Sequence, residues 1–315
     1  MRDAYLSALH RLAGENKDVL ALISDNGAIV YDRFRRDFPE QYFNYGISEA
    51  NMVASAAGLA SCGKLPFAYT ITNFLTMRAF EFIRNDVCLQ EMNVKLVGTG
   101  AGFSYSTLGP THHGTEDIAL MRVLPNITIV CPASPRETYK ATLACAALVG
   151  PTYLRLGTSK EPEIYENDYD FVIGKGIVLK EGTDATIIAT GSITHDALAA
   201  AEELQKNGVS VKVVNIHTIK PIDTGLIVEC ARTTGAIITL EEHNINGGLG
   251  GAVAETLLDN GCNPVFMRMG LIDNFCTGYG SRPDVKKMNG LSPDHIIAKI
   301  REAIAQKRLR NSKAQ

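Results

Sequence analysis

The sequence predicts an α/β protein with two domains, each built on a mostly parallel sheet flanked by helices. Three observations predict this class. The 315 residues are enough for about two domains. Hydrophobic residues make up 45% of the chain and charged residues 21%, a balance that allows real cores to be buried. Short β-branched runs alternate with helical stretches from end to end, as in parallel sheets covered on both faces by helices.

The first half of the chain shows this alternation in order. Stretches of helical periodicity separate short apolar runs of the kind that form buried parallel strands. The predicted helices span 3–14, 48–61, 75–90, 116–122 and 135–148. The predicted strands span 19–23, 66–71, 94–97, 127–130 and 152–155.

The pattern breaks over residues 158–172, which combine acidic turns containing proline with aromatic residues and no periodicity. We therefore expect domains at 1–160 and 176–315, joined by a linker at 161–175. In the second domain the predicted strands span 176–179, 185–189, 209–214, 236–240 and 264–269, and the predicted helices 193–207, 223–233, 250–260 and 293–306. The basic, polar residues 306–315 are expected to fray.

Charge and cysteine content exclude several classes of protein. The net charge is −3 and the sequence has no basic stripe, which argues against nucleic-acid binding. It has no apolar run of about 18 residues, and its first residues lack an apolar signal core. The seven cysteines are scattered and form no Cys-x-x-Cys pair, as expected of reduced thiols. We expect a cytoplasmic enzyme without nucleic-acid or membrane partners.

The motif Gly46-Ile47-Ser48-Glu49 opens the predicted helix 48–61. The remainder of that helix is nearly all small and apolar, so we expect it to be buried on all sides. Glu49 would then be a carboxylate with little water around it, and burying a carboxylate without a partner is costly. The alternative is a carboxylate that simply favours a helix N-terminus through the helix dipole.

A second motif, at 109–117, presents His112 and His113 after a Gly-Pro turn and ahead of an acidic helix start. Histidine in such a loop can act as an acid, a base or a polar clamp. A metal site of both histidines and Glu116 is an alternative, but adjacent histidines rarely point at one ion. Glu116 can also simply cap the helix.

Two further segments carry weaker signals. Residues 69–81 form a strand end that enters an aromatic helix, and ligands bind at the carboxyl ends of such strands. Core packing of Phe74 and Phe80 is the alternative. Residues 241–251 are glycine-rich like a phosphate loop, but Val253 occupies the third glycine position of the dinucleotide fingerprint. A dinucleotide-binding oxidoreductase is therefore disfavoured.

Together and in this order, the motifs resemble the C-terminal half of a transketolase, from Arg2 to about Ile304. The residues that carry the resemblance lie at 46–49, 74–84, 109–112, 153–157 and 241–251. The chain also resembles parts of deoxyxylulose-phosphate synthase and the β subunit of 2-oxoacid dehydrogenases, which remain alternative functions. A non-catalytic paralogue is a third alternative, against which Glu49 and Phe74 argue.

The resemblance implies a thiamine diphosphate enzyme that moves a two-carbon ketol unit from a ketose to an aldose. It implies that Glu49 hydrogen-bonds the pyrimidine ring and promotes its imino tautomer, that Phe74 stacks on this ring, and that His112 binds the substrate. The cofactor pocket implied by the family consists of Glu49, Phe74, Met77, Phe80 and Asp25. No catalytic residue is expected in the second domain, which is interpreted as a scaffold for dimer packing.

The family holds the diphosphate through a divalent metal bound by a Gly-Asp-Gly motif, which this sequence lacks. The resemblance therefore implies a split enzyme, with no metal site in this chain. An N-terminal transketolase subunit would supply Mg²⁺ or another divalent ion and the diphosphate site. The expected assembly is an α2β2 heterotetramer.

The substrate end departs from the family pattern. Leu108 stands where transketolases have an aspartate that reads donor hydroxyls, and Thr158, with Lys160 nearby, stands where they have a phosphate-binding arginine. A histidine expected around Gly100 is absent, Ile29 stands where a serine is expected, and Arg2 persists. We therefore expect an atypical sugar substrate, without the usual terminal phosphate or with another anion such as a sulfonate.

Overall fold

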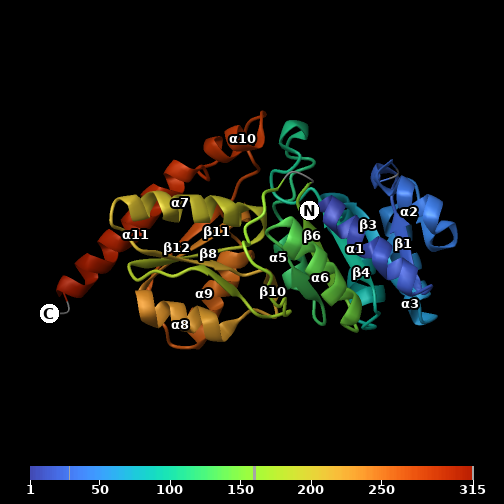
Figure 1. The fold of residues 1–315 in the computed structure, drawn as a ribbon, viewed down its shortest axis with the longest axis horizontal. Helices are drawn as coiled ribbons and strands as arrows, with labels where there is room; N and C mark the ends of the chain where they lie inside the picture. The colour runs from blue at the N-terminus through green and yellow to red at the C-terminus, as the bar shows by residue number, and fades with distance from the viewer. Residues whose placement is uncertain (28, 159–160, 314–315) are drawn as a thin grey trace.

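The computed structural model describes residues 1–27, 29–158 and 161–313. These described residues form two sheets that lie side by side, each with helices on its faces (Figure 1). The first sheet has the strand order β10-β5-β6-β4-β3-β1-β2 and the second has the order β12-β11-β8-β9-β7. The predicted fold class, two α/β units with mostly parallel sheets, is confirmed.

All strands of the first sheet run parallel except β10, which pairs antiparallel with β5. Most of its strands are buried along their length because helices cover both faces, which explains their apolar sequences. The strands are β1 (Val19–Ile23), β2 (Tyr42–Asn44), β3 (Leu65–Ile71), β4 (Lys95–Thr99), β5 (Thr128–Val130), β6 (Thr152–Leu156) and β10 (Thr218–Lys220). Strand β10 comes from the second half of the chain and ties the two halves together.

The helices of the first half are α1 (Arg2–Glu15), α2 (Asp32–Asp37), α3 (Glu49–Ser61), α4 (Phe80–Phe82), α5 (Asp117–Arg122) and α6 (Pro135–Ala147). The prediction of one helix over 75–90 is wrong in detail. The segment is a π-helical stretch at Phe74–Arg78, the short α4, and a second π-helical stretch at Ile83–Cys88. Such π-turns change which side chains share a face, and they occur frequently at functional sites.

The expectation that the helix of the first motif is buried on all sides is also wrong. Glu49, Met52 and Val53 are buried, but Asn51 and Gly58 on the opposite side are exposed. Helix α3 packs against β3 and the 74–88 segment, and its side with Asn51 and Gly58 is exposed among the described residues.

In the described residues the second sheet has five strands and is accompanied by five α-helices. The strands are β7 (Ile177–Lys180), β8 (Ala185–Ala189), β9 (Val211–Asn215), β11 (Ala236–Asn244) and β12 (Val265–Leu271). The helices are α7 (Thr194–Lys206), α8 (Thr224–Thr234), α9 (Leu249–Asp259), α10 (Arg282–Met288) and α11 (Pro293–Lys313). Strand β7 is antiparallel to β9, and the remaining pairs are parallel.

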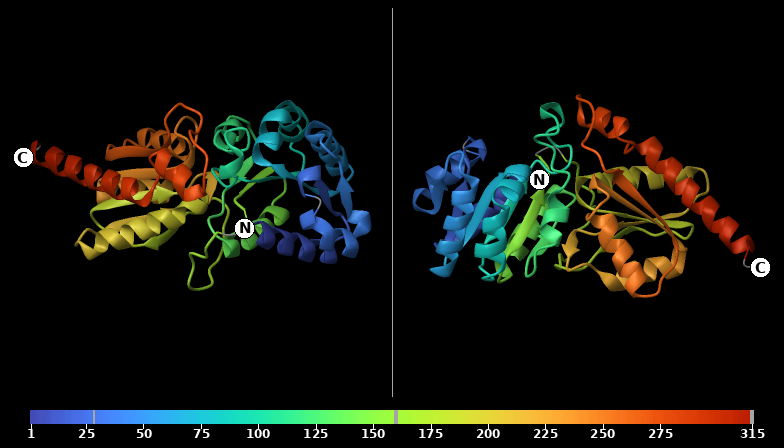
Figure 2. Two further views of the ribbon diagram at one scale, coloured as in Figure 1. Left: turned by 90° about the horizontal axis from the view of Figure 1, so that it is seen from above. Right: turned by 180° about the vertical axis from the view of Figure 1, so that it is seen from behind.

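Helix α11 packs against α7, β11 and β12 and carries the C-terminal end outward from the second sheet (Figure 2). The prediction that residues from 306 onward fray is wrong up to Lys313, and residues 314–315 lie outside the described part. The helix continues because Lys307 Nζ donates to the carbonyl of Thr234 at 2.9 Å and Arg310 donates to the carbonyl of Asn263 at 2.9 Å. Within the described chain every helix is too short or too polar to cross a bilayer.

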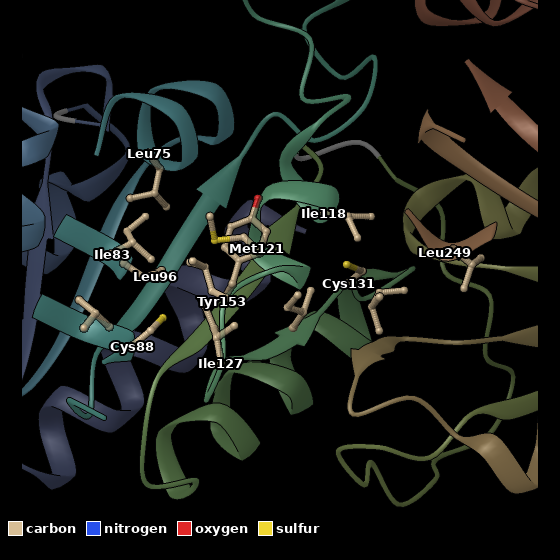
Figure 3. Packing of buried hydrophobic residues seen from close by; sticks show 14 of the residues in the cluster. Leu75, Ile83, Cys88, Leu96, Ile118, Met121, Ile127, Cys131, Tyr153 and Leu249 are labelled. Atoms are coloured by element: carbon tan, nitrogen blue, oxygen red, sulfur yellow. The ribbon is translucent and has the colours of Figure 1, made fainter. Parts of the chain in front are cut away.

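One hydrophobic cluster joins the two halves. It contains Leu96, Met121 and Tyr153 from the first half, and Ile237 and Leu249 from the second. Figure 3 shows Leu249 on the side of this cluster towards Cys131 and Ile118. The shared core fixes the loops of the first half against the second half.

Candidate active site

A pocket of about 720 Å³ lies where the carboxyl end of β3 meets the loop of the second motif. The segments 69–81 and 109–117, far apart in sequence, thus come together as the resemblance implies. The lining residues are Asn73, Phe74, Met77, Arg78, Pro110, Thr111, Glu116 and Phe275. Phe275 belongs to the second half, is 74% exposed, and was missed by the sequence reasoning.

Glu49 lies in the first turn of α3 and is only 2% exposed, so the expectation of a dry carboxylate is confirmed. Its charge is balanced by Arg78, whose Nη1 donates to Oε2 of Glu49 at 2.6 Å. The guanidinium side chain itself is 50% exposed. The helix N-terminus favours the same negative charge, so the dipole interpretation adds to the burial and does not replace it.

Phe74 is half-buried and contacts two side chains in the pocket region. The imidazole of His112 lies edge-on, with ring centroids 5.3 Å apart and an interplanar angle of 70°. The guanidinium of Arg78 lies over the ring, 5.1 Å from its centroid. His112 Nδ1 is 2.9 Å from the hydroxyl of Thr111, which holds the imidazole in place.

His113 packs against a different aromatic ring from its neighbour His112. It is fully buried and packs against Phe103, with ring centroids 5.7 Å apart. Burial lowers the pKa of His113, which disfavours the charged imidazolium. The two histidines therefore face different surroundings, which removes the basis for a metal site shared with Glu116. Among the described residues no group of three or more His, Cys, Asp or Glu side chains is placed to hold a metal ion.

Glu116 lines the pocket and accepts a hydrogen bond from the hydroxyl of Thr115 at 2.9 Å. Burial raises the pKa of its carboxyl group. It precedes α5, but its side chain makes no capping hydrogen bond. Glu116 therefore occupies the N-cap position of α5, as the capping interpretation has it, but its carboxylate does not cap the helix through a hydrogen bond.

The loop that carries His112 is fixed from both ends. Asn73 Nδ2 donates to the carbonyl of His113 at 2.8 Å. At the other end Arg155 donates from Nε to Asp117 at 2.7 Å and from Nη2 to the carbonyl of Gly114 at 2.7 Å. Although burial alone would raise it, Arg155 holds the pKa of Asp117 below its ordinary value.

Arg155 also connects the loop to the second half of the chain, because its Nη2 donates to the carbonyl of Glu242 at 3.1 Å. Nearby, the carboxylate of Glu241 accepts hydrogen bonds from the backbone N–H groups of Leu249 at 2.7 Å and Gly250 at 2.8 Å. The N-terminus of α9, which lies in the glycine-rich segment 241–251, therefore binds a carboxylate of its own chain. Burial raises the pKa of Glu241 to about 7.

The remaining predicted cofactor residues are distributed around this region. Met77 is exposed in the pocket lining. Phe80 is half-buried against the core and is not part of the lining. Asp25 is exposed, and its backbone N–H donates to the carbonyl of Gly46 at 3.1 Å, beside the first motif.

Although His112 contacts one of the lining residues, the predicted substrate residues in the described part of the chain do not themselves line the pocket. Arg2 and Thr158 lie together, because the N–H of Arg2 donates to the carbonyl of Thr158 at 3.3 Å. Leu108 is half-exposed, at the end of the 3₁₀ turn before Gly109. Lys160 lies outside the described residues.

Comparison with known proteins gives two family matches. Residues 1–162 match the pyrimidine binding domain of transketolase, and residues 174–296 match the transketolase C-terminal domain. One subunit of an apulose-4-phosphate transketolase from Actinobacillus succinogenes is 38% identical, over 89% of this chain and 90% of its own length. A 6-deoxy-6-sulfo-D-fructose transketolase subunit from Clostridium sp. (strain MSTE9) is 35% identical, over 98% of this chain and 96% of its own length.

A solved structure described as a split gene transketolase, inactive beta4 tetramer, superimposes with a TM-score of 0.89. It is 42% identical, and the match covers 97% of this chain and 98% of that one. The similarity thus extends over both halves of the chain and over nearly the whole length of these three relatives.

Proposed function

Because this chain belongs to the transketolase family, we propose that it is one subunit of a two-chain transketolase and contributes the pyrimidine-binding half of a thiamine diphosphate site. The observation that carries the proposal is the buried carboxylate of Glu49, which Arg78 links to the Phe74 ring and to the 720 Å³ pocket that both Arg78 and Phe74 line. The complete enzyme would transfer a two-carbon ketol unit from a ketose to an aldose.

The residues present fit an aminopyrimidine ring. Glu49 offers a carboxylate shielded from water, and Phe74 offers a ring face within a pocket lined also by Met77 and Pro110. A planar, partly apolar ring with polar nitrogens needs both features. When bound, the cofactor supplies the carbon nucleophile for cleavage of the ketose C–C bond.

Each of the candidate site residues then has a distinct role. Glu49 exchanges a proton with a ring nitrogen of the pyrimidine, and its dry surroundings strengthen that hydrogen bond. Phe74 orients the ring. His112, held by Thr111 and by its contact with Phe74, donates a hydrogen bond to a carbonyl or hydroxyl oxygen of the sugar. In this proposal Asp25 lies on the thiazolium side of the site, and Phe80 is packed against the core.

The other half of the site would come from an N-terminal transketolase subunit. The sequence lacks Gly-Asp-Gly, and the relatives from Actinobacillus and Clostridium are each called a subunit. We assign the diphosphate and its Mg²⁺ to that partner, in an α2β2 heterotetramer. The exposed side of α3, with Asn51 and Gly58, is available for contacts in this assembly.

The donor is proposed to be an atypical sugar. Leu108 offers no hydrogen bond to a donor hydroxyl, and the position of the usual phosphate-binding arginine holds Thr158, near Lys160. Arg2, next to Thr158, would remain to bind a terminal anion such as a sulfonate. A panel of phosphorylated, sulfonated and neutral ketoses tests this, and strong preference for xylulose 5-phosphate contradicts it.

The function is tested by purifying the chain from its host and measuring thiamine diphosphate binding with and without the chain that copurifies. We expect a partner that contains Gly-Asp-Gly, and cofactor binding by the pair only. Glu49→Gln should reduce turnover by roughly a hundredfold or more while folding is kept. Glu81→Gln, an exposed carboxylate, is the matched control.

Two results would replace this function with an alternative. Decarboxylation of a 2-oxoacid followed by transfer to a lipoyl group would indicate a 2-oxoacid dehydrogenase. Condensation of pyruvate with an aldose phosphate would indicate a deoxyxylulose-phosphate synthase. Tight cofactor binding by this chain alone would contradict the assignment of half the site to a partner.

A further inference from the structure

Arg78 makes two contacts at once in the free chain. Its Nη1 donates to Oε2 of the buried Glu49 at 2.6 Å, and its guanidinium lies over the ring of Phe74 at 5.1 Å from the centroid. The group is planar, carries N–H donors and stacks on an aromatic face. Those are the two contacts that the proposed function assigns to the aminopyrimidine ring, which is also planar and polar at its edge.

We propose that Arg78 is a placeholder for the cofactor: it occupies the pyrimidine position between Glu49 and Phe74 in the free chain and must leave before thiamine diphosphate can bind. This inference rests on the proposed function, because it takes Glu49 and Phe74 as the pyrimidine partners. It adds a competition within the chain that controls access to the site.

The geometry allows the side chain to leave. Arg78 is 50% exposed, so its guanidinium borders solvent, whereas Glu49 is 2% exposed and fixed in the first turn of α3. Arg78 lies at the end of the π-helical stretch Phe74–Arg78, just before Ala79. A rotation of the side chain alone would therefore move the cation into water and open both the carboxylate and the ring face.

The placeholder also explains how the free chain tolerates Glu49. An unpaired carboxylate at this depth is costly, and Arg78 is the ion-pair partner that the described residues provide for it. The stabilisation that the Arg78–Glu49 ion pair gives the free chain is lost when the cofactor binds. The apparent affinity for the cofactor is reduced by the fraction of molecules in which the site is open.

The test measures thiamine diphosphate binding by calorimetry with Mg²⁺ present. It compares the wild-type chain with its variants, each in complex with the copurified partner. Arg78→Met should bind the cofactor roughly tenfold to a hundredfold more tightly, the equivalent of one charge-assisted hydrogen bond. Arg78→Lys keeps the charge but loses the planar face, so its affinity for thiamine diphosphate should lie between those of the wild type and Arg78→Met. Arg84→Met, an exposed arginine of the next segment, should bind like the wild type.

A second measurement needs no cofactor. Thermal unfolding of the free chain should occur at lower temperature for Arg78→Met, because Glu49 loses its partner, and be unchanged for Arg84→Met. If Arg78→Met does not fold, Arg78→Lys carries the test. Equal or weaker binding by the Arg78 variants overturns the placeholder, because Arg78 would then support the bound state. Absence of cofactor binding by the wild-type complex overturns the proposed function itself.

Discussion

Replacing Arg155 by methionine should destabilise the protein more than any surface change, because this side chain anchors three segments. It is 4% exposed and donates to the fully buried carboxylate of Asp117 at 2.7 Å and 3.2 Å. It also donates to the carbonyls of Gly114 and Glu242. The change leaves the Asp117 charge buried, and among the described residues the hydroxyl of Tyr153 at 2.7 Å is then the one hydrogen-bond donor left to its side chain.

The expected loss follows from this geometry. Removing one partner of a buried ion pair costs about 3–5 kcal/mol, because the remaining charge is uncompensated. The carbonyl of Glu242 also loses a donor, which adds about 1–3 kcal/mol where no water replaces that donor, whereas the carbonyl of Gly114 keeps the N–H of Gly102 at 2.8 Å. We therefore expect the free energy of unfolding to fall by about 4 kcal/mol or more.

Urea unfolding followed by far-ultraviolet circular dichroism measures this change. Arg232→Met, an exposed arginine on α8, is the matched control and should be neutral. Adding Asp117→Asn to Arg155→Met should recover part of the loss, since the buried charge is then gone. A loss below about 1 kcal/mol for the single variant, or no recovery in the double variant, would refute the reasoning.

Three further predictions concern buried titratable groups and the pocket. Burial lowers the pKa of His217 from 6.5 to about 4, so between these pH values the unfolded chain binds a proton that the folded chain does not, and the free energy of unfolding should rise by roughly 3 kcal/mol from pH 4 to pH 6.5. Urea titrations at several pH values should show this rise in the wild type and not in His217→Asn. Burial raises the pKa of Glu241 from 4.5 to about 7, so the folded chain holds a proton that the unfolded chain releases, and the free energy of unfolding should fall as the pH rises from 4.5 to 7. In Glu241→Gln the free energy of unfolding should change less between pH 5 and pH 8. Phe275→Ala should weaken cofactor or sugar binding severalfold without lowering the unfolding temperature, because this ring lines the pocket and is 74% exposed; a drop in unfolding temperature would contradict the assignment.

The fold class was predictable because buried parallel strands have a strong sequence signal. The run 19–23 is apolar throughout and is buried at every residue as β1. Strand β10 has no such signal. It has only three residues, and it forms because a segment beyond β9 reaches back to β5 and pairs antiparallel with it. Helices α2 and α10 are too short, with six and seven residues, for periodicity to be recognised.

The site was predictable only where a motif keeps its residues close in sequence. Glu49 and His112 were named as candidates through their motifs, and the structure brings His112 into contact with Phe74. The contribution of Arg78 was missed although the segment itself was recognised, because its pairing with Glu49 depends on how α3 packs against the 74–88 segment. Phe275 was missed because nothing local links it to a pocket formed by the first half.

A subunit that holds half of an active site must be stable before the other half arrives. The shared core, with Tyr153 and Leu249 in one cluster, allows both halves of this chain to fold as one unit. Glu49 works against that stability, since the chemistry proposed for it requires a carboxylate out of water. An arginine that neutralises this carboxylate, and that can withdraw into solvent, serves both requirements. The same pairing makes cofactor entry a competition, so the strength of the Arg78–Glu49 contact should set the cofactor concentration at which the assembled enzyme becomes active.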